Sequence, residues 1–321
     1  MNYDTRIGTD SSVAKHLLDN EEIVAIPTET VYGLAANAFS EKAVKKVYEA
    51  KKRPANNPLI VHVSSKERLQ ELTKDINDKA AILIDNFMPG PLTILLPKNE
   101  LIPDFVTSGL PDVAIRIPAH PLTAKLLSLL DYPLAAPSAN PFGYISPTNA
   151  LHVFEQMNSK IPYILDGGQC NKGIESTIVG FKQGDVVVYR AGSVTIGAIE
   201  SLVGKVTLNT DTEKVVAPGM FRKHYSPHTP LIVTDDLGEA IAANKERKIG
   251  IITYDYYHTD YPTDHQILLG KSVHMAEVAQ NLYSALHKMD ASCFDLIIVK
   301  KLPETDLGIA INEKLYRAAV I

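Results

Sequence analysis

The segment PTETVYGL at residues 27–34 places two hydroxyls and a carboxylate directly after the apolar run 23–26. Open α/β sheets usually present their binding sites where strands end, so Thr28, Glu29 and Thr30 could recognise a polar ligand. A tight turn in which Thr30 caps the backbone would use the same residues. The spacing alone leaves both interpretations open.

The basic cluster Lys51–Arg53 could bind phosphate groups. It comes at the end of an expected helix that Ser40 caps and Pro54 terminates. Basic residues are also favoured at helix C-termini because they interact with the helix dipole. Taken alone, the cluster is therefore better explained by helix stability than by a ligand.

Two arginines beside apolar strands are further candidates for an anion site. Arg116 shares one face of the run 113–117 with Ala114, and this small neighbour leaves room for a ligand. Arg190 ends the run 186–189. Solvated arginines or structural ion pairs would give the same pattern, although two such arginines together favour an anion site.

Two loops carry polar groups next to small residues. In AAPSANP, at residues 135–141, Ser138 and Asn140 offer directional hydrogen bonds while prolines restrain the backbone. A turn closed by an Asx-type bond is the alternative, but the combination of small residues and a polar tip favours a binding loop. The glycine-rich stretch 166–178 ends in hydroxyls and could be a lid or a hairpin connection.

Standard nucleotide and metal signatures are absent from the sequence. There is no GxxxxGK[ST] and no GxGxxG, so ATP would have to bind without a standard phosphate loop. Cys170 and Cys293 form no CxxC pair, and the ten histidines form no HExxH. We therefore expect free thiols and no protein metal site.

The composition is that of an ordinary globular protein, with 45% apolar and 21% charged residues. No uninterrupted apolar run reaches the roughly 18 residues of a membrane span, and the first residues lack the layout of a secretion signal. A cytoplasmic location is expected. The net charge of -5 argues against a broad basic surface for nucleic acid, although a local basic groove would be compatible with it.

Short β-rich runs alternate with helical patterns, which predicts an α/β fold with a mixed sheet. In the first two thirds of the chain, helices are expected at 12–20, 40–52, 65–87, 121–130 and 148–157. Strands are expected at 23–26, 59–63, 92–96, 113–117, 163–165, 176–179 and 186–189.

Near residue 205 the alternation of strand-like and helix-like segments stops, and this change divides the chain into three parts. Residues 1–205 form the larger α/β domain, and 206–230, with three prolines and few aliphatics, are expected to be an ordered linker. Residues 231–321 return to alternation and predict a small three-layer α/β domain. Its strands are expected at 231–233, 249–253, 266–269 and 296–299, and its helices at 237–244, 275–289 and 305–318.

The order of the motifs resembles the YrdC-like family of threonylcarbamoyl-AMP synthases. The matching segments, over residues 10–205, are PTETVYGL, AKKRPANNPLIVH, PGPLT, AIRIPAHP, APSAN, DGG, GIESTI and YRAG. The family's Lys-x-Arg and Ser-x-Asn signatures correspond to Lys51–Arg53 and Ser138–Asn140. The segment APGMFRKHYSP and the tail Gly308–Ala310 resemble those of the longer, two-domain form.

This resemblance implies a YrdC-like twisted mixed sheet with helices around a concave site, followed by a smaller Rossmann-like domain. It implies an enzyme that condenses L-threonine, bicarbonate and ATP to threonylcarbamoyl-AMP and pyrophosphate, for the t6A modification of tRNA. The implied threonine site consists of Thr30, His62, Arg116, Ser138 and Ser176. The implied ATP site consists of Lys51, Arg53, Asn57, Asn140, Thr148, Arg190 and the linker residue Tyr225, with His224 beside it.

The implied chemistry agrees with these residue types. The carbamate formed from threonine must attack the α-phosphorus of ATP, and both partners are anionic. Lys51 and Arg53, the expected catalytic residues, and Arg190 can offset their repulsion, with Mg²⁺ held mainly by phosphates and water. A closing linker would protect the carbamate from solvent. Partner proteins of tRNA modification are expected, with weak tRNA binding and no membrane contact.

Two other functions use the same residues. A non-catalytic nucleic-acid-binding module could use the Lys51–Arg53 cluster, but the acidic net charge, the lack of tryptophan and an aromatic share of 7% argue against it. A carbamoyltransferase component working with carbamoyl phosphate is the third interpretation. The missing zinc-finger-like cysteines and acylphosphatase-like segment argue against that larger architecture.

Overall fold

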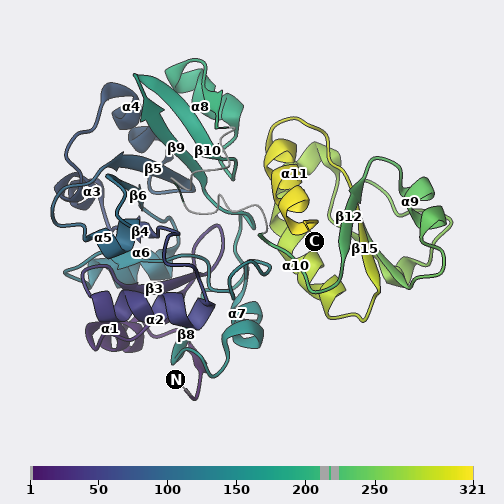
Figure 1. The fold of residues 1–321 in the computed structure, drawn as a ribbon, viewed down its shortest axis with the longest axis horizontal. Coiled ribbons are helices and arrows are strands. Elements are labelled where there is room, and N and C mark those ends of the chain that lie inside the picture. Colours follow the sequence, from purple (N-terminus) through teal and green to yellow (C-terminus); the bar gives the residue numbers. More distant parts are fainter. Residues whose placement is uncertain (1–2, 210–216, 218–223, 321) are drawn as a thin grey trace.

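Two separate β-sheets organise the protein, which we describe from a computed structural model over residues 3–209, 217 and 224–320. The larger sheet belongs to an N-terminal domain and the smaller one to a C-terminal domain, and the domains lie side by side (Figure 1). No helix within these ranges is long and apolar enough to cross a membrane.

The N-terminal sheet has the strand order β1-β8-β2-β3-β7-β4-β6-β5-β9-β10-β11. Parallel and antiparallel neighbours alternate irregularly, since β4 runs parallel to β6 whereas β2 runs antiparallel to β3. The predicted mixed sheet is confirmed. Its strands are β1 (Arg6–Gly8), β2 (Val24–Ile26), β3 (Gly33–Asn37), β4 (Ile60–His62), β5 (Leu92–Pro97), β6 (Asp112–Arg116), β7 (Leu134–Ala135), β8 (Tyr163–Leu165), β9 (Thr177–Lys182), β10 (Asp185–Arg190) and β11 (Thr207–Leu208).

Helices surround this sheet, and most begin at a capping side chain. Ser40 accepts a hydrogen bond from the Ala43 N–H at the start of α2, and Asn149 accepts one from the His152 N–H at the start of α7. The helices are α1 (Ser11–Asp19), α2 (Glu41–Lys51), α3 (Lys66–Leu72), α4 (Asp78–Phe87), α5 (Asp104–Thr107), α6 (Pro121–Ser128), α7 (Ala150–Met157) and α8 (Ile196–Val203).

The single helix predicted over 65–87 was wrong, because the segment forms two helices. Ser65 caps α3, and Asn77 caps the separate helix α4. Between them, Lys74 donates its backbone N–H to the Pro97 carbonyl, which ties the chain to the end of β5. The polar stretch between the helices has no apolar stripe that would hold a continuous helix against the core.

Strand β3 was missed by the sequence prediction, as were β1, β7, β11, α5 and α8. Its sequence GLAAN is rich in residues of low strand propensity, but its ladders with β2 and β7 hold it in the sheet. The threonines of PTETVYGL therefore lie in the connection between two antiparallel strands.

The C-terminal sheet has four parallel strands in the order β12-β15-β13-β14. Alternate residues face opposite layers: Ile251 and Ile298 pack towards α9, and Ile252 and Val299 pack towards α10 and α11. The predicted elements are confirmed to within two residues. They are β12 (Leu231–Thr234), α9 (Leu237–Ala243), β13 (Ile249–Thr253), β14 (Gln266–Leu268), α10 (Met275–Asp290), β15 (Leu296–Lys300) and α11 (Leu307–Ala318). Two short 3-10 helices, η1 (Thr263–His265) and η2 (Ser272–His274), were not predicted.

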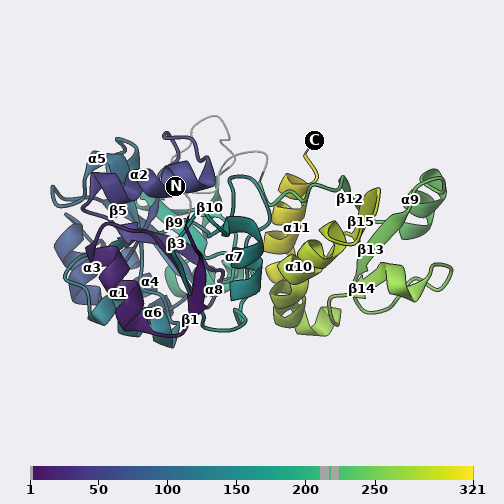
Figure 2. The same ribbon diagram turned by 90° about the horizontal axis from the view of Figure 1, so that it is seen from below.

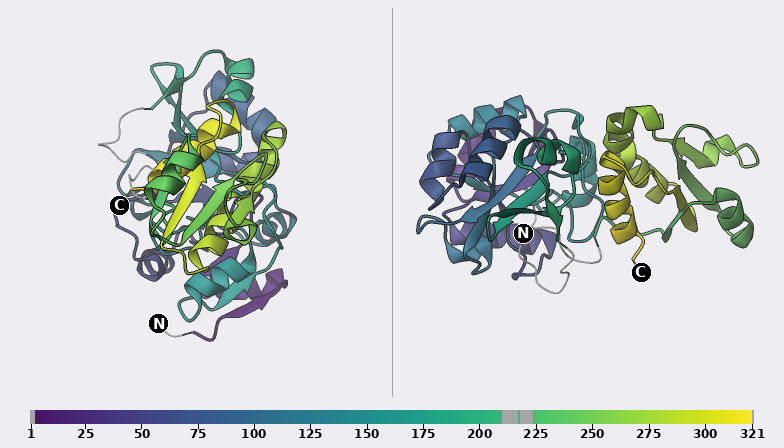
Figure 3. Two further views of the ribbon diagram at one scale, coloured as in Figure 1. Left: turned by 90° about the vertical axis from the view of Figure 1, so that its right-hand side faces the viewer. Right: turned by 90° about the horizontal axis from the view of Figure 1, so that it is seen from above.

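Helices α10 and α11 lie between the C-terminal sheet and the N-terminal domain, while α9 lies on the far side (Figures 2 and 3). Val31, Ile145, Ile174 and Ala191 of the N-terminal domain belong to the same buried cluster as Leu282 of α10. The apolar core is therefore continuous across the interface, so that contacts made by α10 and α11 can influence the larger domain.

Most of the predicted linker 206–230 lies outside the described residues. Thr207 and Leu208 form β11 beside β10, and Tyr225 is buried between the domains. The division at 205 and 230 stays a prediction.

Candidate active site

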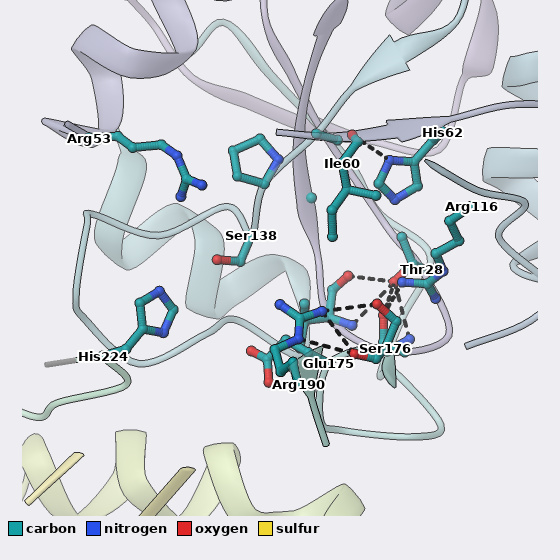
Figure 4. A pocket seen from close by; sticks show the side chains of 15 residues that line it. Thr28, Arg53, Ile60, His62, Arg116, Ser138, Glu175, Ser176, Arg190 and His224 are labelled. Carbon is teal, nitrogen blue, oxygen red and sulfur yellow. Dashed lines mark hydrogen bonds between the residues drawn. The ribbon is translucent and has the colours of Figure 1, made fainter. Parts of the chain in front are cut away.

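A partly open cavity lies where several strands of the N-terminal sheet end. Thr28 and seven residues of the implied threonine and ATP sites line this cavity, and they come from six different segments (Figure 4). The seven are Thr30, Arg53, His62, Arg116, Ser138, Ser176 and Arg190. The cavity therefore brings together both arginines singled out beside strands, the basic cluster, and the loops that end in hydroxyls.

Arg116 is held on one wall by groups of two segments. Its Nε donates to the Gly90 carbonyl at 3.1 Å, its Nη1 donates to Thr30 Oγ1 at 3.0 Å, and its Nη2 lies 2.7 Å from a Glu29 carboxylate oxygen. Burial is the largest single influence and disfavours the charged form of Glu29, but the Arg116 charge, the hydrogen bond from Arg116 and backbone N–H groups together outweigh it and hold the pKa of Glu29 below its ordinary value. This fixed guanidinium is a suitable anchor for a small carboxylate.

His62 lies beside Arg116, because the two residues are register partners on the parallel strands β4 and β6. Burial and the Arg116 charge lower the pKa of His62 to about 3, so the ring is neutral near pH 7. Its Nδ1 lies 3.2 Å from the Ile60 carbonyl, which can only accept, so Nδ1 carries the proton. The Nε2 atom is then a hydrogen-bond acceptor.

A second wall is built around the contact between Arg190 and Ser176. Arg190 Nη2 donates to the Ser176 carbonyl at 2.9 Å and to its hydroxyl at 3.0 Å, and Nε donates to the same carbonyl at 3.1 Å. The Thr93 hydroxyl lies 2.7 Å from the Ser176 hydroxyl. The start of β9 and the end of β10 are thereby locked together, and a cation is placed in the cavity.

The Lys51–Arg53 cluster behaves differently from a solvated helix end, because both residues are buried. Arg53 lines the cavity and donates to the backbone carbonyls of Asn57 and Pro58, and burial lowers its pKa to about 10. The Lys51 ammonium donates to the carbonyls of Ser138 and Asn140. Burial and the Arg53 charge hold the pKa of Lys51 well below its usual range. Lys51 thus ties α2 to the binding loop.

Asn57, Asn140 and Tyr225 lie near the lining without belonging to it. Both side-chain polar atoms of Asn57, the Asn140 Oδ1 and the Tyr225 hydroxyl have no hydrogen-bond partner among the described residues. Buried polar atoms are rarely left unpaired, so these groups are suited to bind a ligand. Thr148 lies elsewhere, with its hydroxyl 3.3 Å from His152 Nδ1 and 3.2 Å from the Ser284 hydroxyl.

Two polar residues of the lining, Glu175 and His224, were not predicted as members of either site. Glu175 precedes Ser176, and His224 precedes Tyr225. Burial, together with the charges of Lys51 and Arg53, holds the pKa of His224 well below its ordinary value, so it is neutral. Neither their spacing nor their residue type marks these two residues as members of a site. Only the tertiary structure places them in the cavity lining.

Comparisons with known proteins identify both domains. A family model for Sua5, YciO and YrdC proteins, described as "Telomere recombination", matches residues 16–192. A second family model, described as "Threonylcarbamoyl-AMP synthase, C-terminal domain", matches residues 194–320. Together the two models cover most of the chain.

Individual relatives agree over nearly the whole length. The threonylcarbamoyl-AMP synthase of Pyrococcus abyssi is 41% identical, over 96% of this chain and 93% of the relative. The synthase of Bacillus subtilis is 40% identical, over 95% of this chain and 92% of the relative. The solved structure of P. abyssi Sua5 complexed with L-threonine superposes with a TM-score of 0.91 at 38% identity, covering 99% of this chain and 98% of the other. The chain therefore belongs to the Sua5/YrdC family of threonylcarbamoyl-AMP synthases, in its two-domain form.

Proposed function

We propose that the N-terminal cavity binds L-threonine and ATP side by side and that its arginines hold the two anions together. The observation that carries this proposal is the convergence of Arg53, Arg116 and Arg190 on one cavity. The reaction joins a carbamate to a triphosphate, and two anions approach each other only where fixed cations offset their repulsion.

The threonine site lies on the wall formed by β4 and β6. Arg116 binds the threonine carboxylate with the N–H groups that its protein partners leave available, and the neutral His62 accepts a hydrogen bond through Nε2. The hydroxyls of Thr30, Ser138 and Ser176 complete the polar contacts. The relative solved with L-threonine supports a threonine site in this chain.

The ATP site lies on the wall formed by Arg53 and Arg190, which bind the phosphates. The unpaired polar atoms of Asn57, Asn140 and Tyr225 supply directional contacts to the nucleotide. Lys51 holds the Ser138–Asn140 loop and adds positive charge behind it. Thr148, the remaining member of the predicted ATP site, gains no support from its surroundings and stays a prediction.

In the proposed reaction, the threonine amine forms a bond to the carbon of bicarbonate, a C–O bond breaks, and water leaves, which gives the carbamate. A carbamate oxygen forms a bond to the α-phosphorus of ATP while the bond to the pyrophosphate oxygen breaks. The protein contributes orientation and charge, as is usual for phosphoryl-type transfer, and the arginines stabilise the negative charge that develops on the phosphates. The shielded cavity limits hydrolysis of the carbamate.

Mg²⁺ enters this proposal as part of the substrate. No group of three or more His, Cys, Asp or Glu among the described residues could hold a metal ion, and the lining of the cavity is rich in arginine. This donor set does not fit a resident metal. Magnesium would arrive with ATP and be coordinated by phosphates and water.

The proposal extends to the surroundings of the site. The segment between residues 205 and 231 acts as a linker that brings His224 and Tyr225 to the nucleotide, and the domains divide at its ends. The product passes to partner proteins of tRNA modification in the cytoplasm, with tRNA itself bound weakly.

Calorimetric titration of two matched variants tests the two halves of the site. We expect Arg116→Gln to weaken threonine binding at least tenfold, and Arg190→Gln to weaken ATP binding by a similar factor, about 1.4 kcal/mol or more each. Each variant should leave the other substrate within about threefold. Loss of both ligands in both variants while they remain folded at the assay temperature, or of neither, would refute the division into two subsites.

A further inference from the structure

Two neighbouring side chains of α11 hold the backbone next to Arg190. Glu313 accepts a hydrogen bond from the Ala191 N–H at 3.1 Å, and the Lys314 ammonium donates to the Ala191 carbonyl at 2.8 Å. Lys314 is only 1% exposed. The C-terminal domain thus binds both polar backbone groups of the residue that directly follows the cavity arginine.

The same lysine faces a carboxylate of the cavity. Lys314 Nζ lies 4.0 Å from the Glu175 carboxylate, which also accepts a hydrogen bond from the Tyr283 hydroxyl of α10 at 2.7 Å. Glu175 lines the cavity, and its neighbour Ser176 binds the Arg190 guanidinium. Helices α10 and α11 therefore reach both sides of the contact between Ser176 and Arg190.

These helices also hold Tyr225, the tyrosine that the sequence analysis assigned to ATP. Its ring stacks on Tyr283 with the centroids 5.6 Å apart, and the Lys314 ammonium lies 5.8 Å from its centroid. The C-terminal domain thus contacts the Ala191 backbone, Glu175 and Tyr225, which lie in or beside the cavity wall, and two of the contacting residues, Lys314 and Tyr283, are themselves buried. A helix pair that merely covered the larger domain would not need a buried charge there.

We propose that Lys314, supported by Glu313 and Tyr283, is a positioning residue of the synthase, through which the C-terminal domain keeps Arg190 available for ATP. The inference rests on the proposed ATP role of Arg190. Lys314 neutralises Glu175 and fixes the Ala191 backbone. Without this ammonium, the Glu175 carboxylate is left beside the cavity with Arg190 as the alternative cation (Figure 4). An ion pair between them would withdraw the guanidinium from the nucleotide.

Steady-state kinetics of Lys314→Met tests the proposal, with Lys301→Met as the matched control. Lys301 belongs to the same domain but forms a surface ion pair with Glu304. We expect Lys314→Met to raise KM for ATP about tenfold, while kcat and KM for threonine change less than about threefold. Lys301→Met should match the parent enzyme. An unchanged KM for ATP in Lys314→Met, measured well below its unfolding temperature, would overturn the proposal even if the variant is less stable.

A double variant separates positioning from packing. If Glu175 captures Arg190, Glu175→Gln/Lys314→Met should return KM for ATP to within about threefold of the parent value, whereas independent effects would multiply. A double variant as impaired as Lys314→Met would contradict the mechanism. Should Lys314→Met fail to fold, Tyr283→Phe removes only one hydrogen bond of Glu175, and we expect a rise of about threefold in KM for ATP. No rise in Tyr283→Phe would then refute the role.

Arg190→Gln, measured alongside, distinguishes failure of this inference from failure of the proposed function. If Arg190→Gln raises KM for ATP but Lys314→Met does not, only the positioning role is wrong. If Arg190→Gln leaves KM for ATP unchanged, the ATP role of Arg190 is wrong, and the positioning role falls with it.

Discussion

At the scale of single residues, the cavity is built from charged groups that the protein buries and then holds. Arg53, Arg116 and Arg190 are only 8%, 3% and 6% exposed, yet every one of these guanidinium groups binds backbone carbonyls. Holding the side chains in advance lowers the entropy lost when a substrate binds, which favours catalysis of a reaction that depends on orientation. Such residues also carry a stability cost when one partner is removed.

Loss of Arg116 should show this cost. We expect Arg116→Gln to lower the free energy of unfolding by about 3–5 kcal/mol, because the buried Glu29 carboxylate loses its partner. Glu29→Gln in the same chain should recover most of this stability without restoring threonine binding. Urea unfolding of the parent protein, Arg116→Gln and the double variant measures the effect. Equal free energies of unfolding for these three proteins would contradict a stabilising ion pair.

The pH dependence of Glu29 follows from its lowered pKa. The stability that this carboxylate contributes is fully present above its ordinary pKa of 4.5 and is lost as the pH falls through the lower folded-state pKa. As the pH falls below 5, the free energy of unfolding should therefore decrease less in Glu29→Gln than in the parent protein. Urea unfolding at several pH values measures this decrease. Parallel curves for the two proteins would refute the assignment.

Most of the polar residues that line the cavity could be predicted from the sequence, because the family's motifs include them. How they are held could not be predicted. Glu175 and Lys314 are 139 positions apart in the sequence, so nothing local indicates that they face each other. Lys51 was predicted as a phosphate ligand, a role that remains a prediction, but its contacts to the Ser138 and Asn140 carbonyls appear only in the folded chain.

At the scale of elements, helices and strands with a clear apolar pattern were predicted well, as β13 and α10 illustrate. The apolar residues of α10 match the period of a helix, whereas β13 is a short apolar run that is buried on both faces, as is usual for a parallel sheet. The prediction failed where hydrogen bonds to neighbouring strands determine the secondary structure. Strand β3 was missed because it is held as a strand by its pairing with β2 and β7. The break between α3 and α4 likewise depends on a contact with β5.

The segment that carries Tyr225 offers a prediction at this scale. The hydroxyl of Tyr225 has no partner among the described residues, while its ring packs on Tyr283. We expect Tyr225→Ala to weaken ATP retention at least tenfold and threonine binding much less. Exposed Tyr316 provides the control variant Tyr316→Ala. Equilibrium binding of each substrate decides the matter, and equal losses for the two substrates would exclude a nucleotide-specific role.

At the scale of the whole molecule, the domains meet closely enough that one methyl group matters. Gly173 adopts φ +71°, and a Cβ there would lie 2.3 Å from the Gln280 Cα of α10. The active-site loop and the C-terminal domain are therefore fitted to each other at the backbone level.

Gly173→Ala tests this fit against Gly168→Ala. Gly168 has a similar φ of +76°, but a Cβ there would meet no atom within 4 Å. Backbone strain of about 1–2 kcal/mol is common to both variants, so any further loss in Gly173→Ala reports the domain contact. We expect that variant to be the less stable one in urea unfolding and to have the higher KM for ATP. If the two variants had the same stability and the same KM for ATP, α10 would be able to shift away from the added methyl group without affecting the active site.

Acid stability of the whole protein should reflect its buried histidines. Burial lowers the pKa of His62 and His287 to about 3 and of His152 to about 4, so the folded protein excludes protons that the unfolded chain takes up near pH 6.5. Stability should therefore fall as the pH decreases below 6.5, by about 1.4 kcal/mol per pH unit for each such histidine. Calorimetric unfolding between pH 7 and 4.5 measures the slope, and a flat profile would contradict neutral burial.

A structure of the enzyme with L-threonine and a non-hydrolysable ATP analogue bound together tests the central claim most directly. The account predicts threonine against Arg116 and His62, and the α-phosphate between Arg53 and Arg190 within reach of the threonine amine. A nucleotide bound to the C-terminal sheet, or phosphates outside the N-terminal cavity, would contradict it.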